Sequence, residues 1–393
     1  MIIKPKYKGF ICLTAHPEGC YKNVEDFAKL ATSKPLDEDN APKNVLVLGG
    51  STGYGLASRI TATFAAKANT MSVAFERPST GKRTATTGYY NDAAVTKLAK
   101  LHGLNDVSLN GDAFSDEMKA EVIKAWNKAY PGEKIDLVVY SLASPKRKDP
   151  KDGELYSSVI KPVGEAYTNK TVDFHSGVVT DVTIEPAAGE EVDATIKVMG
   201  GEDWKLWIDA LLGADLLSDD VITVAYSYIG PEITHAIYKD GTIGLAKNHL
   251  LATSELLNDE LSKKGGRAFV SVNKALVTQS SAAIPVVPLY ISLLYKVMKE
   301  DGSHEDTLDQ MLRLFHDKLY SDINDVRDLN NPIRIDDLEM EDEIQAKVDA
   351  LWKTANSDNI EEISDLVGYR KEFFSLFGFG RDDVDYELDV EEF

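Results

Sequence analysis

A short apolar run that ends in a glycine-rich turn restricts the fold of this chain more than any other feature. Residues Asn44–Leu48 are predicted to form a buried β-strand, and Gly49, Gly53 and Gly55 follow it in a G-x-x-x-G-x-G spacing. A helix is expected next, over Gly55–Lys67. Glycine permits the tight turn and a close backbone approach to a pyrophosphate, while the helix N-terminus favours phosphate charge. The turn therefore predicts a dinucleotide-binding unit.

Strands and helices alternate along the rest of the chain, which is typical of parallel βαβ units. Further strands are predicted at Thr70–Phe75, Asp106–Asn110, Ile135–Tyr140, Val221–Tyr226 and Ala268–Val272. Helices are predicted at Asn23–Thr32, Asp116–Tyr130, Asp203–Leu212, Ile243–Leu261, Pro288–Met298, His304–Tyr320 and Glu341–Thr354. The predicted class is α/β: a Rossmann-like doubly wound parallel sheet with an antiparallel hairpin insertion and extra C-terminal helices.

Three segments depart from the alternation. Residues 1–43 are expected to form an N-terminal hairpin, pairing Met1–Lys4 with Phe10–Thr14, and a helix. Residues 145–200 are expected to be an insertion whose hairpin pairs Thr171–Phe174 with Val178–Ile184. Residues 334–393 form an acidic helical segment, and the whole chain, 1–393, is predicted to be one enlarged domain.

Charge and composition exclude several classes of protein. The chain has 43 basic and 64 acidic residues, a net charge of −21, so a basic nucleic-acid footprint is not expected. The segment from Arg334 onward holds −13 of this charge and is predicted to be a solvated face. No apolar stretch is long enough for a membrane span or shaped like a secretory signal. Cys12 and Cys20 are too few for a disulfide framework, which favours a cytoplasmic setting.

Polar side chains follow several predicted strands, at the edge where ligands bind in a doubly wound sheet. Glu76 can accept hydrogen bonds from the adenosine ribose and would repel a 2′-phosphate, which favours NADH over NADPH. Asp112 could reach the adenine, and the small residues at Ser141–Ser144 would let a ribose approach.

Tyr238 and Lys247 form the most informative pair. Short-chain dehydrogenases place Tyr-x3-Lys one turn apart on one helix, but here eight residues intervene. Gly241 and Gly244 interrupt the helix after Tyr238, so the tyrosine can precede the helix start while Lys247 lies in its first turns. A phenol is a weak acid, and a nearby ammonium stabilises the phenolate and favours proton release. The pair is therefore predicted to converge on one catalytic site.

The sequence resembles the NADH-dependent trans-2-enoyl-CoA reductases and the related enoyl-acyl-carrier-protein reductases marked by Tyr-x8-Lys. The resemblance runs through essentially the whole chain. Its segments are Met1–Pro5, Cys12–Cys20, Asn44–Arg59, Gly111–Ser115, Val139–Pro145, Val198–Trp204, Ala225–Pro231, Ala268–Lys274 and Asp365–Tyr369.

This resemblance implies a role for particular residues. Tyr238 matches the proton donor, Tyr228 a tyrosine that contacts the substrate thioester, and Lys247 the cofactor-binding lysine. The other implied cofactor-binding residues are Gly49, Gly50, Ser51, Thr52, Gly53, Tyr54, Phe75, Glu76, Asp112, Ala113, Ser141, Leu142, Leu276, Val277 and Thr278. No metal is implied.

The implied reaction is the last reductive step of fatty-acid elongation. Hydride from NADH reaches C3 of a trans-2-enoyl thioester, tyrosine hydroxyls stabilise the enolate oxygen, and protonation at C2 gives the saturated product. The apolar run Ala282–Tyr295 could wall the acyl pocket, pack the core, or do both. A carbonyl reductase of 3-oxoacyl thioesters and a non-catalytic dinucleotide-binding module are the alternatives.

The expected substrates are enoyl-CoA and enoyl thioesters of acyl carrier protein, and the expected assembly is a monomer or homodimer. The basic cluster Lys146, Arg147, Lys148 and Lys151 could meet the phosphates of either carrier. Because Asp149 and Asp152 dilute its charge, a solvated loop is the favoured interpretation.

Overall fold

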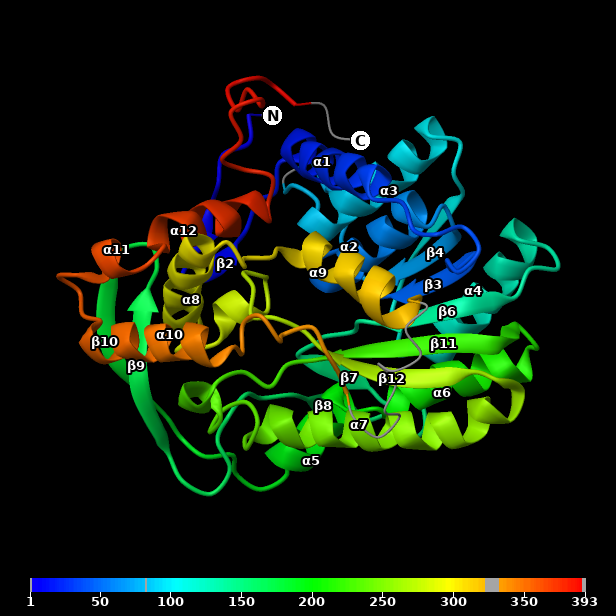
Figure 1. Cartoon of the computed structure of the whole chain (residues 1–393). Helices are drawn as coiled ribbons and strands as arrows, with labels where there is room; N and C mark the ends of the chain where they lie inside the picture. Colours follow the sequence, from blue (N-terminus) through cyan, green and yellow to red (C-terminus); the bar gives the residue numbers. More distant parts are fainter. Residues whose placement is uncertain (1, 82, 322–331, 391–393) are drawn as a thin grey trace.

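A seven-stranded parallel sheet forms the centre of the computed structural model, which describes residues 2–81, 83–321 and 332–390 (Figure 1). Its strands are β3 (Asn44–Leu48), β4 (Asn69–Ala74), β5 (Asp106–Asn110), β6 (Ile135–Tyr140), β11 (Leu217–Ser227), β12 (Arg267–Val272) and β13 (Ile333–Arg334). They lie in the order β13-β12-β11-β6-β3-β4-β5, so the strand order reverses beside β3. The predicted doubly wound sheet is confirmed.

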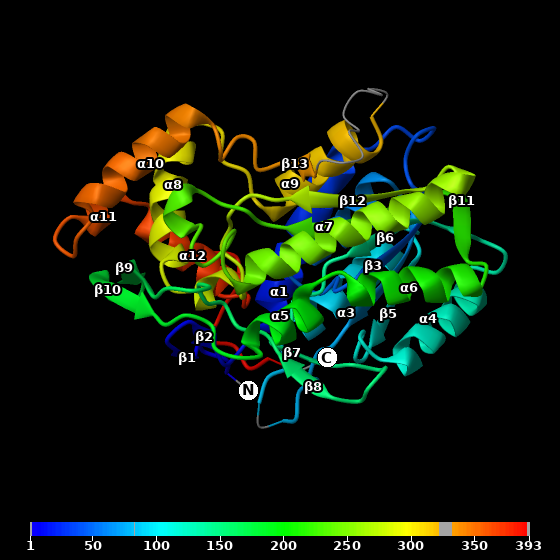
Figure 2. The ribbon, with the colours of Figure 1, turned by 90° about the horizontal axis from the view of Figure 1, so that it is seen from below.

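Helices cover both faces of the sheet because its central strands are apolar on both sides. Val45 and Val47 of β3 pack into one core, and Leu46 and Leu48 into the other, with all four side chains fully buried. The first face is covered by α1 (Pro17–Ser33), α2 (Gly53–Ile60), α3 (Thr87–Leu101) and α9 (Thr307–Arg313). The second is covered by α4 (Asp116–Ala129), α6 (Glu202–Gly213) and α7 (Thr242–Leu261), which Figure 2 shows in front of the strands.

A third apolar core lies beside the sheet and confirms the extra C-terminal helices (Figure 1). Its elements are α8 (Val287–Asp301), α10 (Asp342–Thr354), α11 (Ile360–Ile363), α12 (Leu366–Ser375) and the hairpin β9 (Tyr167–Asp173) with β10 (Val178–Ile184). Helix α8 is apolar around its circumference and is buried between α10 and α12, as such a helix must be.

Several sequence predictions need correction. The predicted first strand of the N-terminal hairpin, Met1–Lys4, is wrong, because its described residues 2–4 form no strand and the short hairpin instead pairs β1 (Tyr7–Lys8) with β2 (Ile11–Cys12). Helix α1 begins six residues early, at Pro17, because proline suits a first helical position and the preceding His16 accepts a hydrogen bond from the N–H of Gly19. Helix α3 was not predicted at all.

The insertion at residues 145–200 is also richer than predicted. Besides the expected hairpin it holds a second one, β7 (Lys146–Lys148) with β8 (Leu155–Ser157), and a helix, α5 (Glu191–Met199). The expected strand Thr171–Phe174 in fact starts at Tyr167. Among the described residues, no helix is both long and apolar enough to cross a membrane.

The acidic C-terminal segment is not simply a solvated face. Asp336 and Glu339 are 1% and 0% exposed, and the C-terminal residues from 391 onward lie outside the described part of the chain. Buried carboxylates require partners, so this part of the segment belongs to the interior.

A buried arginine joins the glycine-turn helix to the sheet, and its removal should destabilise the fold. Arg59 on α2 is fully buried and donates to both carboxylate oxygens of Asp106 on β5, with Nε 2.9 Å from Oδ1. We expect Arg59→Ala to lower the free energy of unfolding by about 3–5 kcal/mol, because it leaves a buried carboxylate unpaired. Lys29→Ala, which breaks an exposed pair with Glu25, is the control and should change little. Equal effects in urea denaturation would contradict this account.

Candidate active site

A cavity of about 1020 Å³ opens at the carboxyl ends of the strands, where the predicted site residues meet. The predicted residues that line it are Gly49, Ser51, Thr52, Gly53, Tyr54, Phe75, Glu76, Asp112, Ala113, Ser141, Leu142, Tyr228, Tyr238, Lys247, Leu276, Val277 and Thr278. Gly50 is not among the lining residues. A Cβ there would lie 2.3 Å from Oγ of Ser72, so Gly50 packs the turn against β4 instead.

The glycine turn has the geometry of an anion site. Gly49 has φ +89°, and a Cβ on it would lie 2.4 Å from the carbonyl oxygen of Ser141. Helix α2 begins at Gly53, two residues earlier than predicted, and the side chain of its N-cap residue Thr52 makes no capping hydrogen bond. The first-turn N–H groups of α2 therefore remain available to a negatively charged group in the cavity.

Glu76 is held in place at the rim of the cavity. Its carboxylate accepts hydrogen bonds from Oγ of Ser51 at 2.7 Å and from Oγ1 of Thr86 at 2.5 Å. The neighbouring Phe75 is 78% exposed and lines the same cavity. A fixed carboxylate beside a free aromatic face provides hydrogen-bond acceptors and a stacking surface for an adenosine.

Tyr238 and Lys247 both line the cavity. Tyr238 lies in the turns before α7, and Lys247 lies in the second turn of that helix. The chain can fold back this closely because residue 244 is glycine: a Cβ there would lie 2.2 Å from the carbonyl oxygen of Tyr238. Nζ of Lys247 donates to the carbonyl oxygen of Tyr226 at 2.8 Å, and burial lowers the pKa of Lys247 to about 8.

Tyr228 packs against Tyr238. Their ring centroids lie 4.8 Å apart in an edge-to-face arrangement, so both hydroxyl groups belong to one site. The Tyr228 hydroxyl donates a long hydrogen bond, 3.3 Å, to Oε1 of Glu339. Burial raises the pKa of both phenols, so both stay protonated at neutral pH and can donate hydrogen bonds.

Sequence reasoning missed Glu339 and Lys274. Glu339 is fully buried: Oε1 accepts from the Tyr290 hydroxyl at 2.7 Å, and Oε2 from the N–H of Ala275 at 2.7 Å. Burial raises the pKa of Glu339, and it lowers the pKa of the buried Lys274 to about 8 even though nearby carboxylates oppose that shift. No sequence pattern distinguishes Glu339 from its acidic neighbours, so only the structure reveals it.

The apolar run Ala282–Tyr295 both lines the cavity and packs a core. Ile284, Val287, Ile291 and Tyr295 line the cavity, and all four are buried in the third core. One side of α8 is therefore a wall of the site, and the remainder is packed by the C-terminal helices.

The sheet, its glycine turn and the Tyr–Lys pair together define a nicotinamide-dependent oxidoreductase of the short-chain dehydrogenase/reductase type. A family model described as the trans-2-enoyl-CoA reductase catalytic region matches residues 83–320. A model of the NAD(P)H binding domain of trans-2-enoyl-CoA reductase matches residues 2–81. The chain belongs to the trans-2-enoyl-CoA reductase family.

Similar proteins span the whole chain. An enoyl-[acyl-carrier-protein] reductase [NADH] from Coxiella burnetii is 53% identical over 392 residues, covering 100% of this chain and 96% of that protein. A trans-2-enoyl-CoA reductase [NADH] from Ruminiclostridium cellulolyticum is 53% identical, with 100% and 98% covered. The solved structure of Treponema denticola trans-2-enoyl-CoA reductase in complex with NAD is 50% identical, with a TM-score of 0.95 and 100% and 99% covered.

A third family model, described as an enoyl reductase FAD binding domain, matches residues 327–390. The described part of this region does not fit a flavin. Its helices bury their apolar faces against α8, and its charge is strongly negative. Arg381, the cation from this region that lines the cavity, is already paired with Asp26 at 2.8 Å and with Asp383 at 2.7 Å. No step is derived through a flavin.

Removing the Glu339 carboxylate should affect both stability and turnover. Glu339→Ala leaves the Tyr290 hydroxyl and the N–H of Ala275 without their buried acceptor, and it removes a negative charge near the buried ammonium of Lys274. We expect the free energy of unfolding to fall by about 3–5 kcal/mol. We also expect kcat to fall about tenfold, or ~1.4 kcal/mol, because Glu339 no longer positions the Tyr228 side chain before the substrate binds.

Urea denaturation and steady-state kinetics measure the two effects. Glu343→Ala, at an exposed acid of the same segment, is the matched control. Glu339→Gln keeps the shape and one acceptor oxygen and should recover most of the stability. An alanine variant with normal kcat would show that Glu339 is structural only.

Proposed function

We propose that this chain reduces the C2=C3 double bond of trans-2-enoyl thioesters to saturated acyl thioesters with NADH. The observation that supports this most directly is the single cavity shared by the glycine turn, Glu76, Tyr238 and Lys247. The full-length similarity to NADH-dependent enoyl-thioester reductases gives the substrate class.

We assign the cofactor to the strand-end residues. Residues 49–54 would hold the pyrophosphate, with Gly50 shaping the turn, and Phe75 and Glu76 would hold the adenosine. Asp112, Ala113, Ser141 and Leu142 would flank the cofactor, Leu276–Thr278 would lie near the nicotinamide, and Lys247 would hold its ribose. When bound, NADH supplies the hydride. The residues fit this role because the free N–H groups of α2 and the exposed ring of Phe75 face the cavity.

The chain's own part in the reaction is to stabilise charge and move a proton. As C3 is reduced, negative charge develops on the thioester oxygen, where the hydroxyls of Tyr228 and Tyr238 can donate hydrogen bonds. The 3.3 Å bond from Tyr228 to Glu339 is long, so this hydroxyl can turn to the substrate at little cost. Tyr238 then supplies the proton, and the ammonium of Lys247 stabilises the phenolate that remains.

The acyl chain would lie against α8. Val287 and Ile291 on this helix line the cavity, as do Leu276 and Ile284 from the segment before it. Burial of an apolar chain against such a wall is favourable, at roughly 0.8 kcal/mol per methylene. The pocket therefore suits a fatty acyl thioester.

We further propose that the chain acts as one enlarged reductase domain, 1–393, in the last reductive step of fatty-acid elongation. All three regions matched by family models contribute residues to the cavity, which supports one functional unit. Cys12 and Cys20 are unpaired thiols, which agrees with a cytoplasmic enzyme. Either CoA or acyl carrier protein can present the thioester, and a monomer or homodimer would suffice because the cavity is complete within one chain.

The test is loss of NADH absorbance with purified protein and crotonyl-CoA, with NADPH and acetoacetyl-CoA in parallel. We expect rapid oxidation of NADH with crotonyl-CoA and no oxidation of NADH with acetoacetyl-CoA. Oxidation with acetoacetyl-CoA instead would identify a carbonyl reductase. Binding of NADH without turnover of crotonyl-CoA, longer enoyl-CoA or enoyl carrier-protein thioesters would identify a binding module.

Tyr238→Phe should nearly abolish turnover. The change removes one hydroxyl and keeps the ring that packs against Tyr228, so NADH binding should persist. We expect kcat to fall at least ~100-fold, the usual contribution of a general acid. Steady-state kinetics and NADH fluorescence titration measure the two effects. Unchanged turnover would refute the role assigned to Tyr238.

Glu76→Ala should relax the preference for NADH. The fixed carboxylate repels a 2′-phosphate and accepts from the ribose, so we expect the NADH/NADPH ratio of kcat/KM to fall about tenfold or more. Glu76→Gln keeps an acceptor oxygen for hydrogen bonds but removes the negative charge. It therefore separates the contribution of charge repulsion from the contribution of hydrogen bonding to the ribose. An unchanged ratio in both variants would show that another group sets cofactor preference.

A further inference from the structure

The strand β7 carries two lysines on one side and an arginine on the other. Side chains alternate along a strand, and here Arg147 is 1% exposed while Lys146 and Lys148 are exposed. Both lysines line the rim of the active-site cavity. The prediction of a solvated loop is therefore wrong for Arg147, and the two lysines face the site.

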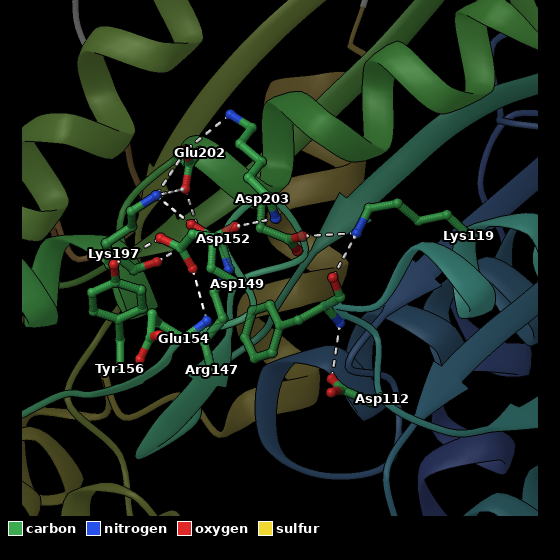
Figure 3. Close-up of polar contacts among 12 residues, drawn as sticks. Asp112, Lys119, Arg147, Asp149, Asp152, Glu154, Tyr156, Lys197, Glu202 and Asp203 are labelled. Carbon is green, nitrogen blue, oxygen red and sulfur yellow. Dashed lines mark hydrogen bonds and ion pairs between the residues drawn. The ribbon is translucent and has the colours of Figure 1, made fainter.

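Arg147 fixes the strand from the inside. Its Nη1 donates to the carbonyl oxygen of Lys197 at 2.6 Å and lies 3.0 Å from Oε2 of Glu202. Figure 3 shows this side chain among the carboxylates of Asp149 and Glu202. Burial alone would raise the pKa of Asp149, but hydrogen bonds from Lys197 and Lys151 and the charge of Arg147 hold that pKa low. The strand is thus anchored by charges that neutralise one another.

The carboxylates of Asp149 and Glu202 also form ion pairs with the neighbouring lysines. Lys197 pairs with Asp149 and Glu202, and Lys151 lies 3.0 Å from Glu202. In the described part of the chain, by contrast, no ion pair or side-chain hydrogen bond engages Nζ of Lys146 or Lys148. Two unpaired ammonium groups at the mouth of a cavity are notable in a chain of net charge −21, because acidic partners are abundant elsewhere.

We propose that Lys146 and Lys148 bind the phosphate of the pantetheine arm that carries the enoyl thioester. This inference rests on the proposed function. CoA and the prosthetic arm of a carrier protein share a phosphate joined to pantetheine, and CoA adds a second phosphate and a 3′-phosphate. The extended arm separates this phosphate from the reacting thioester, so it must bind at the rim when the acyl end is inside.

The rim geometry suits such an anion better than the cofactor. The glycine turn and the N-terminus of α2 already provide for the pyrophosphate of NADH. Lysine is a compact charge on a flexible stem, which suits a phosphate that passes in and out with each turnover. Lys146 and Lys148 thus add a specificity site for the carrier, distinct from the groups that act on the double bond.

The test compares crotonyl thioesters whose thiol carriers differ in whether they contain phosphate. We expect the double variant Lys146→Ala/Lys148→Ala to raise the KM for crotonyl-CoA about tenfold, with kcat and the Kd for NADH unchanged. The KM for crotonyl-N-acetylcysteamine, which has no phosphate, should not change. Lys124→Ala/Lys128→Ala, with the same charge change at exposed positions of α4, is the matched control.

Comparison of further substrates shows which phosphate group the two lysines bind. A raised KM for both crotonyl-CoA and a crotonyl carrier-protein thioester supports the proposal through the shared phosphate. A raised KM for crotonyl-CoA but not for its dephospho form would assign the two lysines to the 3′-phosphate and would overturn their assignment to the phosphate of the arm.

The proposal is overturned if the double variant leaves the KM for crotonyl-CoA unchanged, or raises it equally for the N-acetylcysteamine thioester. It is also overturned if the Kd for NADH rises instead. Failure of the proposed function would look different, because the unmodified protein would then oxidise NADH with none of these thioesters.

Discussion

Parallel pairing of β3 with β4 and with β6 is the constraint on which the rest of the structure depends. Parallel neighbours need a crossover connection, so every strand must be followed by a return over one face of the sheet. Because the strand order reverses beside β3, the connections from β3 and β6 leave in opposite directions and open a crevice between them. Gly49 and Ser141 meet at that point, and the cavity begins there.

The crevice alone would bind a nucleotide but would not enclose a fatty acyl group. Enclosure comes from the third core, in which α8 is buried between the C-terminal helices and faces the cavity through Val287 and Ile291. The segment before α10 places Glu339 within hydrogen-bond distance of the hydroxyls of Tyr228 and Tyr290. The third core therefore supplies a wall of the cavity, and the segment before α10 supplies a hydrogen-bond acceptor for Tyr228.

Buried charge is the recurring means by which this acidic protein fixes its site. Arg59 ties the glycine-turn helix to β5, Arg147 anchors the strand at the cavity mouth, and Glu339 lies near the buried Lys274. A buried charge without a partner costs several kcal/mol, so each cluster tolerates one arrangement of its elements. Rigidity at these three places is compatible with the precise positioning that proton and hydride transfer require.

The sequence by itself determined the parts of the protein that are local in the chain. The β3 strand and the glycine turn predicted the sheet class, which the structure confirms, because these features depend on neighbouring residues. The Tyr238–Lys247 spacing likewise predicted residues that the structure places along one cavity. Helix α3 and the hairpin β7–β8 escaped prediction because each is stabilised by distant packing more than by its own pattern.

Only the tertiary structure decided which charged residues are buried. Glu339 and Arg147 look like members of solvated runs, and burial of a charge depends on partners far away in the chain: Tyr290 for Glu339, and Lys197 and Glu202 for Arg147. The energy that keeps each one inside comes from those partners. No local pattern in the sequence could reveal it, because the contacts exist only once the chain is folded.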